Sequence, residues 1–83
     1  MLRVHSEADA EGGVVLRLEG SLNGPWIAEL QRAAQAAPVG RLAIDLSGLA
    51  YADRDGERLL RDLATRAELR GCSAFLREML RGG

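Results

Sequence analysis

The chain has 83 residues, enough for one domain that spans residues 1–83 and holds a single core. A formal net charge of -1 supplies no basic field, so the composition gives no support for nucleic-acid binding. One cysteine excludes an internal disulfide and a cysteine-based metal site, and no apolar run approaches the roughly 18 residues that a membrane span needs. Without a basic and apolar signal segment at its start, the chain is expected to be cytoplasmic, with no direct membrane insertion.

Alternating apolar and polar residues predict two strands early in the chain, over residues 2–8 and 14–19. A turn-forming stretch at residues 9–13 separates them, so we expect the strands to pair as a hairpin. One face of this pair is charged and is expected to face water, as one side of an antiparallel sheet often does. The charged residues are Arg3, His5, Glu7, Arg17 and Glu19.

A helix is expected next, because Gly20–Gly24 break the strand pattern and Pro25 suits a first helical turn. Pro38 and Gly40 are expected to end this helix. Its apolar residues recur at helical spacing. They are Ile27, Leu30, Ala34 and Ala37.

The second half of the chain predicts two more strands and two more helices. A third strand, Leu42–Leu46, leads into a loop, and a second helix follows over Glu57–Thr65 with an apolar stripe. Residues 67–72 suit a brief fourth strand, and Ser73 suits the N-cap of a last helix. The expected order is β-β-α-β-α-β-α. We therefore predict an α/β (α+β) fold with a mixed four-stranded sheet and about three helices packed mainly on one face.

A tight polar cluster, Asp53–Gly56, stands between the third strand and the second helix. Asp53 can cap the helix, while Asp55 and Glu57 complement its dipole. The same corner can instead form a docking surface for a protein partner. The residues expected to contact the partner are Asp53, Arg54, Asp55, Glu57, Arg58 and Arg61.

Several of these segments resemble the STAS family (sulfate transporter and anti-sigma factor antagonist domains), over nearly the whole chain. The segments are Leu18–Leu22, Leu42–Asp53 with Gly56, and Ser73–Leu80, which is similar to the closing helix of short bacterial members. The most specific part is Leu42–Leu60. The resemblance implies a STAS-like fold and a non-catalytic interaction module that resembles an anti-sigma factor antagonist.

The resemblance also implies how the corner is used. In the antagonists, the hydroxyl residue after the family aspartate is phosphorylated by a partner kinase, which ends the interaction. Asp53 matches the family aspartate and Gly56 the family glycine, whereas Arg54 stands at the acceptor position and has no hydroxyl. No phospho-acceptor is therefore expected there, and an anti-sigma-type kinase is the first candidate partner. The non-phosphorylatable corner and short length also resemble the STAS subunit that binds the ATPase of a lipid-transport ABC system.

Other functions stay open at this stage. A nucleotide or small-anion sensor would hold its ligand at the start of the second helix, and a homodimer could be the whole function. The sequence contains no catalytic constellation, no P-loop signature and no lysine, so we expect no enzyme, cofactor or metal. Trp26 suits either core packing or a binding hot spot. His5, Asp45 and Cys72 suit structural roles.

Overall fold

The structure is a computed structural model that describes residues 1–37 and 40–81. Its elements are β1 (Leu2–Ala8), β2 (Val14–Leu22), α1 (Trp26–Gln35), β3 (Leu42–Ala52), α2 (Arg54–Leu63), β4 (Glu68–Arg70) and α3 (Ala74–Arg81). This is the predicted order β-β-α-β-α-β-α, and the predicted STAS-like mixed sheet is confirmed. No helix among the described residues combines the length and the apolar character that crossing a membrane requires.

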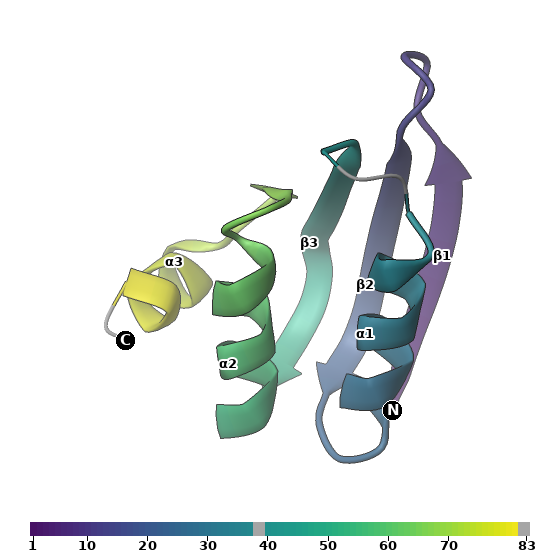
Figure 1. The fold of residues 1–83 in the computed structure, drawn as a ribbon. Helices are drawn as coiled ribbons and strands as arrows, with labels where there is room; N and C mark the ends of the chain where they lie inside the picture. The colour runs from purple at the N-terminus through teal and green to yellow at the C-terminus, as the bar shows by residue number, and fades with distance from the viewer. Residues whose placement is uncertain (38–39, 82–83) are drawn as a thin grey trace.

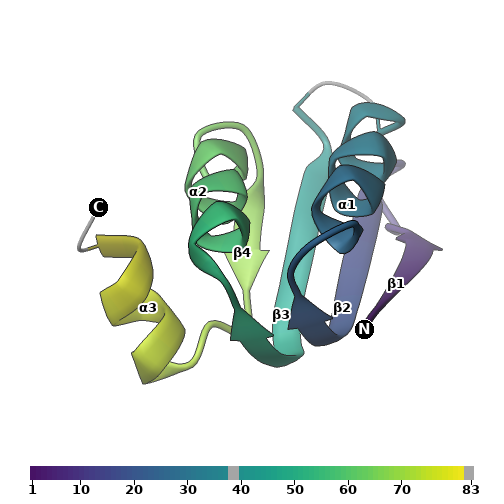
Figure 2. The same cartoon turned by 90° about the horizontal axis from the view of Figure 1, so that it is seen from below.

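The four strands form one sheet in the order β1-β2-β3-β4. β1 and β2 pair antiparallel through the predicted hairpin, while β3 is parallel to both β2 and β4. Figures 1 and 2 show α1 and α2 side by side on one face of the sheet, with α3 beside α2. The other face of the sheet carries no helix, which agrees with the charged face predicted for the first two strands.

The core lies between the sheet and the helices and is built largely from leucine. Leu30 of α1 and Leu60 and Leu63 of α2 are fully buried against the strands. Burying a leucine side chain contributes about 1.5–3 kcal/mol, so this layer supplies the main driving force for the fold. The largest fully buried side chains are Leu16, Leu18, Leu22, Leu30, Ile44, Leu46, Leu60 and Leu63.

The third strand is longer than predicted, because residues 47–52 continue as strand rather than as a loop. Two register shifts against β2 explain the error: Arg17 pairs with Asp45 but Glu19 pairs with Gly48, and a second shift follows Gly20. Each shift inserts one extra residue in β3, which changes the face to which later side chains point. The inward residues are therefore unevenly spaced, and simple alternation does not reveal the strand. They are Ile44, Leu46, Leu49 and Ala52.

The second strand also runs further than predicted, through Gly20 to Leu22. Gly20 was expected to end it, but the residue has a positive φ of 101° and lies close to the carbonyl oxygen of Met1, with which a Cβ would collide. Glycine is tolerated here because only glycine allows this backbone to approach so closely.

The helix boundaries differ from the predictions mainly at the start of α2. This helix begins at Arg54 rather than Glu57 and ends at Leu63. Pro25 is the N-cap of α1 rather than part of its first turn, and α1 ends at Gln35. The predicted stop at Pro38 lies outside the described residues. The predicted cap of α3 is confirmed, since the backbone N–H of Leu76 donates to Ser73 Oγ at 3.1 Å.

Candidate protein-docking site at the start of α2

The site is the corner where β3 passes into α2, residues 53–58, which we call the α2 corner. Asp53 is the N-cap and has extended backbone, and its Oδ1 accepts a hydrogen bond of 2.7 Å from the Gly56 N–H. The Asp53 N–H donates to the carbonyl oxygen of Leu22 at 3.1 Å. This backbone hydrogen bond holds the α2 corner against the end of β2. Asp53 has the capping role predicted for it, and its side chain is only half-buried.

Gly56 lies in the first turn of α2 and is buried against the end of β2. A Cβ at this position would lie 2.6 Å from the Leu22 carbonyl oxygen and 3.0 Å from Leu22 Cγ. A backbone atom cannot yield to such a contact without moving the strand or the helix. Gly56 therefore sets how closely α2 approaches the sheet, which agrees with the packing role expected for it.

Three charged residues of the α2 corner point away from this packing. Arg54, Asp55 and Arg58 are exposed, and none of them forms an ion pair with another residue of the described chain. The dipole of α2 favours Asp55 in the first turn but disfavours Arg54 beside it. Arg54 and Arg58 are also four residues apart, where two like charges repel each other on a helix. The acidic residues within reach pair elsewhere, since Glu57 binds Arg61 and Asp62 binds Arg66.

Glu57 and Arg61 form the remaining charged pair of the predicted site. Arg61 Nη2 lies 3.3 Å from Glu57 Oε2, in the i,i+4 arrangement that was expected. Arg61 Nε is buried and has no hydrogen-bond partner among the described residues. Arg54, Arg58 and Arg61 follow one another at spacings of four and three residues, so they form a basic stripe along one face of α2.

Tyr51 lies three residues before Arg54 and is an exposed aromatic residue beside the candidate site that the sequence did not reveal. Its side chain is 52% exposed, which is unusual for a large aromatic residue at the end of a strand. The irregular pairing of β3 hides it, because the second register shift aligns Tyr51 with Ser21 and directs it away from the core. Trp26, by contrast, is half-buried and packs against the core, which favours the structural interpretation of that residue.

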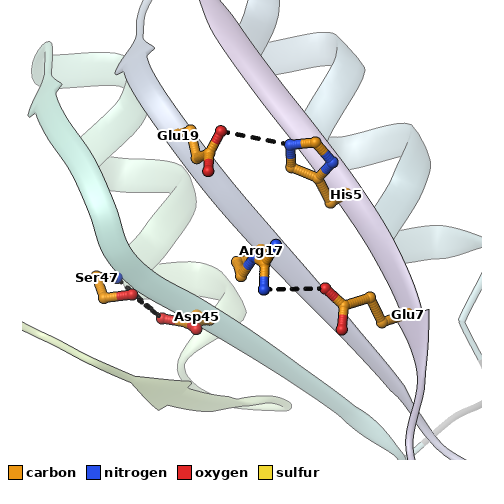
Figure 3. Close-up of polar contacts among 6 residues, drawn as sticks. All are labelled: His5, Glu7, Arg17, Glu19, Asp45 and Ser47. Carbon is orange, nitrogen blue, oxygen red and sulfur yellow. Dashed lines mark hydrogen bonds and ion pairs between the residues drawn. The ribbon is translucent and has the colours of Figure 1, made fainter.

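The helix-free face of the sheet is also highly charged, and two ion pairs cross its first two strands. His5 Nε2 lies 3.4 Å from Glu19 Oε2, and Arg17 Nη1 lies 3.2 Å from Glu7 Oε1, both across the β1–β2 pair (Figure 3). His5 is thus a surface residue of this face, as expected.

Asp45 has a structural role on the same face. Its Oδ1 accepts hydrogen bonds from the Ser47 N–H at 2.9 Å and from Ser47 Oγ at 2.7 Å (Figure 3). These two bonds lower the pKa of the Asp45 carboxyl from its ordinary value of 3.8, with help from the nearby Arg17 and Arg70. The carboxylate steadies β3 at its first register shift, which is the local capping role expected for it.

Two other features of the described chain bear on the site. Within residues 1–37 and 40–81, no three His, Cys, Asp or Glu side chains gather as a metal site. A hollow of about 450 Å³ lies at the start of β3, so it is remote from the corner that follows the end of this strand, and its lining includes Arg41, Arg66 and Glu68. Cys72 packs against the core.

Comparison with known proteins identifies the family. A family model described as "Mlab, STAS domain" matches residues 5–81. A solved STAS domain of an antisigma-factor antagonist from Rhodobacter sphaeroides has the same fold, with a TM-score of 0.57 and 21% identity over 86% of this chain and 87% of that one. No curated protein matches the chain. The resemblance read from Leu42–Leu60 is therefore confirmed, and the chain belongs to the STAS domain family.

Proposed function

We propose that this chain is a non-catalytic protein-interaction module that docks a regulatory partner through the α2 corner and the basic stripe of α2. The observation that carries the proposal is the unpaired state of Arg54, Asp55 and Arg58 around the rigid, buried Gly56. Charges that form no ion pair within the fold, held on a well-packed helix, are typical of a recognition surface. Tyr51 adds an exposed aromatic side chain of the type enriched at interface hot spots.

The basic stripe indicates the chemistry of the partner surface. Arg54, Arg58 and Arg61 would meet carboxylates, with which guanidinium groups make bidentate hydrogen bonds. Such a complex should weaken as ionic strength rises, because exposed charge pairs are screened over about 10 Å at 0.1 M salt. We therefore expect an acidic patch on the partner and a salt-dependent affinity.

Two classes of partner fit this surface. Resemblance to anti-sigma factor antagonists suggests an anti-sigma-type kinase. The second class is the ATPase of a lipid-transport ABC system, and a specific observation favours it: Arg54 occupies the acceptor position, so phosphorylation cannot release the partner there. A permanent subunit of an assembly needs no such release. Affinity purification from the native host, with identification of the bound protein, separates the two classes.

The geometry of the α2 corner gives less support to the alternative function, a nucleotide or small-anion sensor. Asp53 already accepts the Gly56 N–H, and Asp55 and Glu57 repel an anion from the remaining amides at the start of α2. A thermal-shift screen with nucleotides and inorganic phosphate tests this alternative. Stabilisation by several degrees with one of these compounds would favour a sensor over a docking module.

The central test exchanges charges at the corner without changing net charge. The double variant Arg54→Glu with Asp55→Arg should abolish partner binding and leave the fold intact, since the two changes have opposite effects on the helix dipole. The matched control is Glu29→Arg with Arg32→Glu, which exchanges the exposed i,i+3 pair of α1. Calorimetric titration of the purified partner should give wild-type affinity for this control.

The affinity of the double variant decides whether the α2 corner is the docking site. Unchanged affinity of the Arg54 and Asp55 double variant, with a normal circular dichroism spectrum, would exclude the α2 corner as the docking site. Equal loss in the α1 control would show that binding is sensitive to charge exchange away from the corner and would not support the corner as the docking site.

A further inference from the structure

Besides the α2 corner, the free edge of β1 is a surface of the fold at which another chain could bind. β1 stands at the end of the strand order and has a neighbour only on its β2 side within the described chain (Figure 1). It is seven residues long, contains neither proline nor glycine and pairs with β2 without a register shift. The other edge strand, β4, has three residues. A long regular edge is a template for another strand unless it is blocked.

The hydrogen bonds at both ends of β1 show which of its backbone groups are unused. The Ser21 N–H donates to the Met1 carbonyl oxygen, and the Asp9 N–H donates to the Gly13 carbonyl oxygen, both at 2.8 Å. In an antiparallel pair every second residue bonds to the same neighbour. Odd-numbered residues of β1 therefore bond to β2, and the backbone groups of the even-numbered residues point to the free edge. These residues are Leu2, Val4, Ser6 and Ala8.

We propose that β1 pairs antiparallel with β1 of a second copy of this chain, centred on His5. Symmetric pairing over all seven residues places Leu2 opposite Ala8 and Val4 opposite Ser6, so every hydrogen-bonded pair consists of even-numbered residues. This is the arrangement that the unused backbone groups require. The two four-stranded sheets then join into one continuous sheet.

The side chains on the helix-free face support the same register. Arg3 is exposed and forms no ion pair within the described chain, and the pairing places it opposite Glu7 of the second copy, twice in each dimer. These are non-hydrogen-bonded positions, where facing Cα atoms are only about 4.5 Å apart. Glu7 uses Oε1 to bind Arg17, which leaves Oε2 for Arg3. A shift of two residues one way would put Arg3 opposite His5, and a shift the other way would put it opposite Asp9 beyond the end of β1, so only the centred register pairs all seven residues.

The interface is separate from the proposed docking site. β1 is the edge opposite β4, whereas α2 packs over β3, so two copies joined at β1 would each keep an exposed α2 corner. A partner that is itself dimeric could then be bound at two points, which raises the overall affinity without a new contact.

A proline at an outward-facing amide tests the interface. Ser6→Pro removes an edge N–H but leaves the bonds to β2, and proline is accepted on an edge strand in that orientation. Ser6→Ala is the matched control, because it keeps the N–H. Sedimentation equilibrium should show a concentration-dependent dimer for wild type and Ser6→Ala and a monomer for Ser6→Pro.

A charge change provides a second variant that does not alter the backbone. Arg3→Glu places like charges opposite each other twice and should raise the dissociation constant of the dimer roughly tenfold. Arg32→Glu makes the same change on α1 and should leave the constant unchanged. If Ser6→Pro unfolds the chain, Arg3→Glu alone decides the question.

Amide hydrogen exchange gives a readout that is specific to the register. In the wild type, exchange at Val4 and Ser6 should slow markedly as protein concentration rises, while exchange at Arg3 and His5 should be slow throughout. A chain that stays monomeric with fast exchange at Val4 and Ser6 would overturn the proposal. A dimer that neither Ser6→Pro nor Arg3→Glu weakens would place the interface elsewhere and overturn it equally.

Discussion

The helix-free face of the sheet and the α2 corner are both exposed and both rich in charge, yet they satisfy their charges differently. On the sheet face, Arg17 and His5 find partners across neighbouring strands. At the α2 corner, Arg54, Asp55 and Arg58 find none within the described chain. The contrast separates a surface on which most of these charges are paired, Arg3 excepted, from one on which three neighbouring charges form no ion pair within the described chain.

The reason for the difference is geometric. The ion pairs of the sheet face join diagonal neighbours, since the register sets His5 opposite Arg17 and Glu7 opposite Val15. Diagonal positions lie about 7–8 Å apart, which is within reach of long side chains. On α2, Arg54 has Glu57 at the third position and Arg58 at the fourth, but Glu57 pairs with Arg61 instead. The register thus brings opposite charges together on the sheet face, whereas Arg54, Asp55 and Arg58 form no ion pair within the described chain.

The largest stability effect is expected at Gly56. Glycine to alanine in a helix normally stabilises by about 1 kcal/mol, but here the added Cβ would meet the Leu22 carbonyl oxygen at 2.6 Å. We expect Gly56→Ala to lower the free energy of unfolding by about 1–3 kcal/mol, as overpacking does. Urea unfolding measures this, and Arg58→Ala on the exposed face of the same helix should be nearly neutral. A gain in stability for Gly56→Ala would show that α2 does not depend on this close approach.

A smaller effect is expected at Asp53, and it separates capping from docking. Asp53→Ala should cost about 0.5–2 kcal/mol of stability, because the Gly56 N–H loses its acceptor. Asp53→Asn retains an acceptor oxygen and should remain close to wild type in thermal unfolding. If partner affinity falls equally for both variants, the negative charge of Asp53 takes part in docking. If only the alanine variant binds weakly, Asp53 acts through the helix geometry.

The smallest effect is expected at Asp45 on the sheet face, and it depends on pH. The folded-state pKa of Asp45 is lowered, so its contribution to stability is present above the unfolded-state pKa of about 3.9 and is lost as pH falls through the folded value. Asp45→Asn should therefore be less stable than wild type near neutral pH, and the two unfolding curves should converge in acid. A difference that stays constant down to about pH 2 would mean that the charge of Asp45 contributes nothing. Partner affinity should not change, since Asp45 lies on the face of the sheet away from the described helices.

The sequence was most informative where an element is determined by its own residues. The apolar stripe of α2 was read correctly because Gly56, Leu59, Leu60 and Leu63 all lie on the buried face of a single helix. The caps at Asp53 and Ser73 were also found, since a capping oxygen bonds an amide only three residues away. The family resemblance rested on the same local segments.

The docking role of Asp53, Arg54, Asp55, Glu57, Arg58 and Arg61 stays a prediction. The structure separates these residues into two groups. Asp53 caps the helix and Glu57 pairs with Arg61, whereas Arg54, Asp55 and Arg58 form no ion pair within the described chain. Spacing in the sequence predicted the cap at Asp53, but it could not show which charges form no ion pair, because a salt bridge depends on the rotamers that the fold allows.

The order of the elements, the buried face of each helix and the capping residues follow from the sequence itself, because 3.6- and 2-residue periodicity and short-range hydrogen bonds are local properties. Only the tertiary structure decided the length of β3, the exposure of Tyr51 and the free edge of β1. These depend on strand pairing, and the register of a pair is set jointly by residues far apart in the chain.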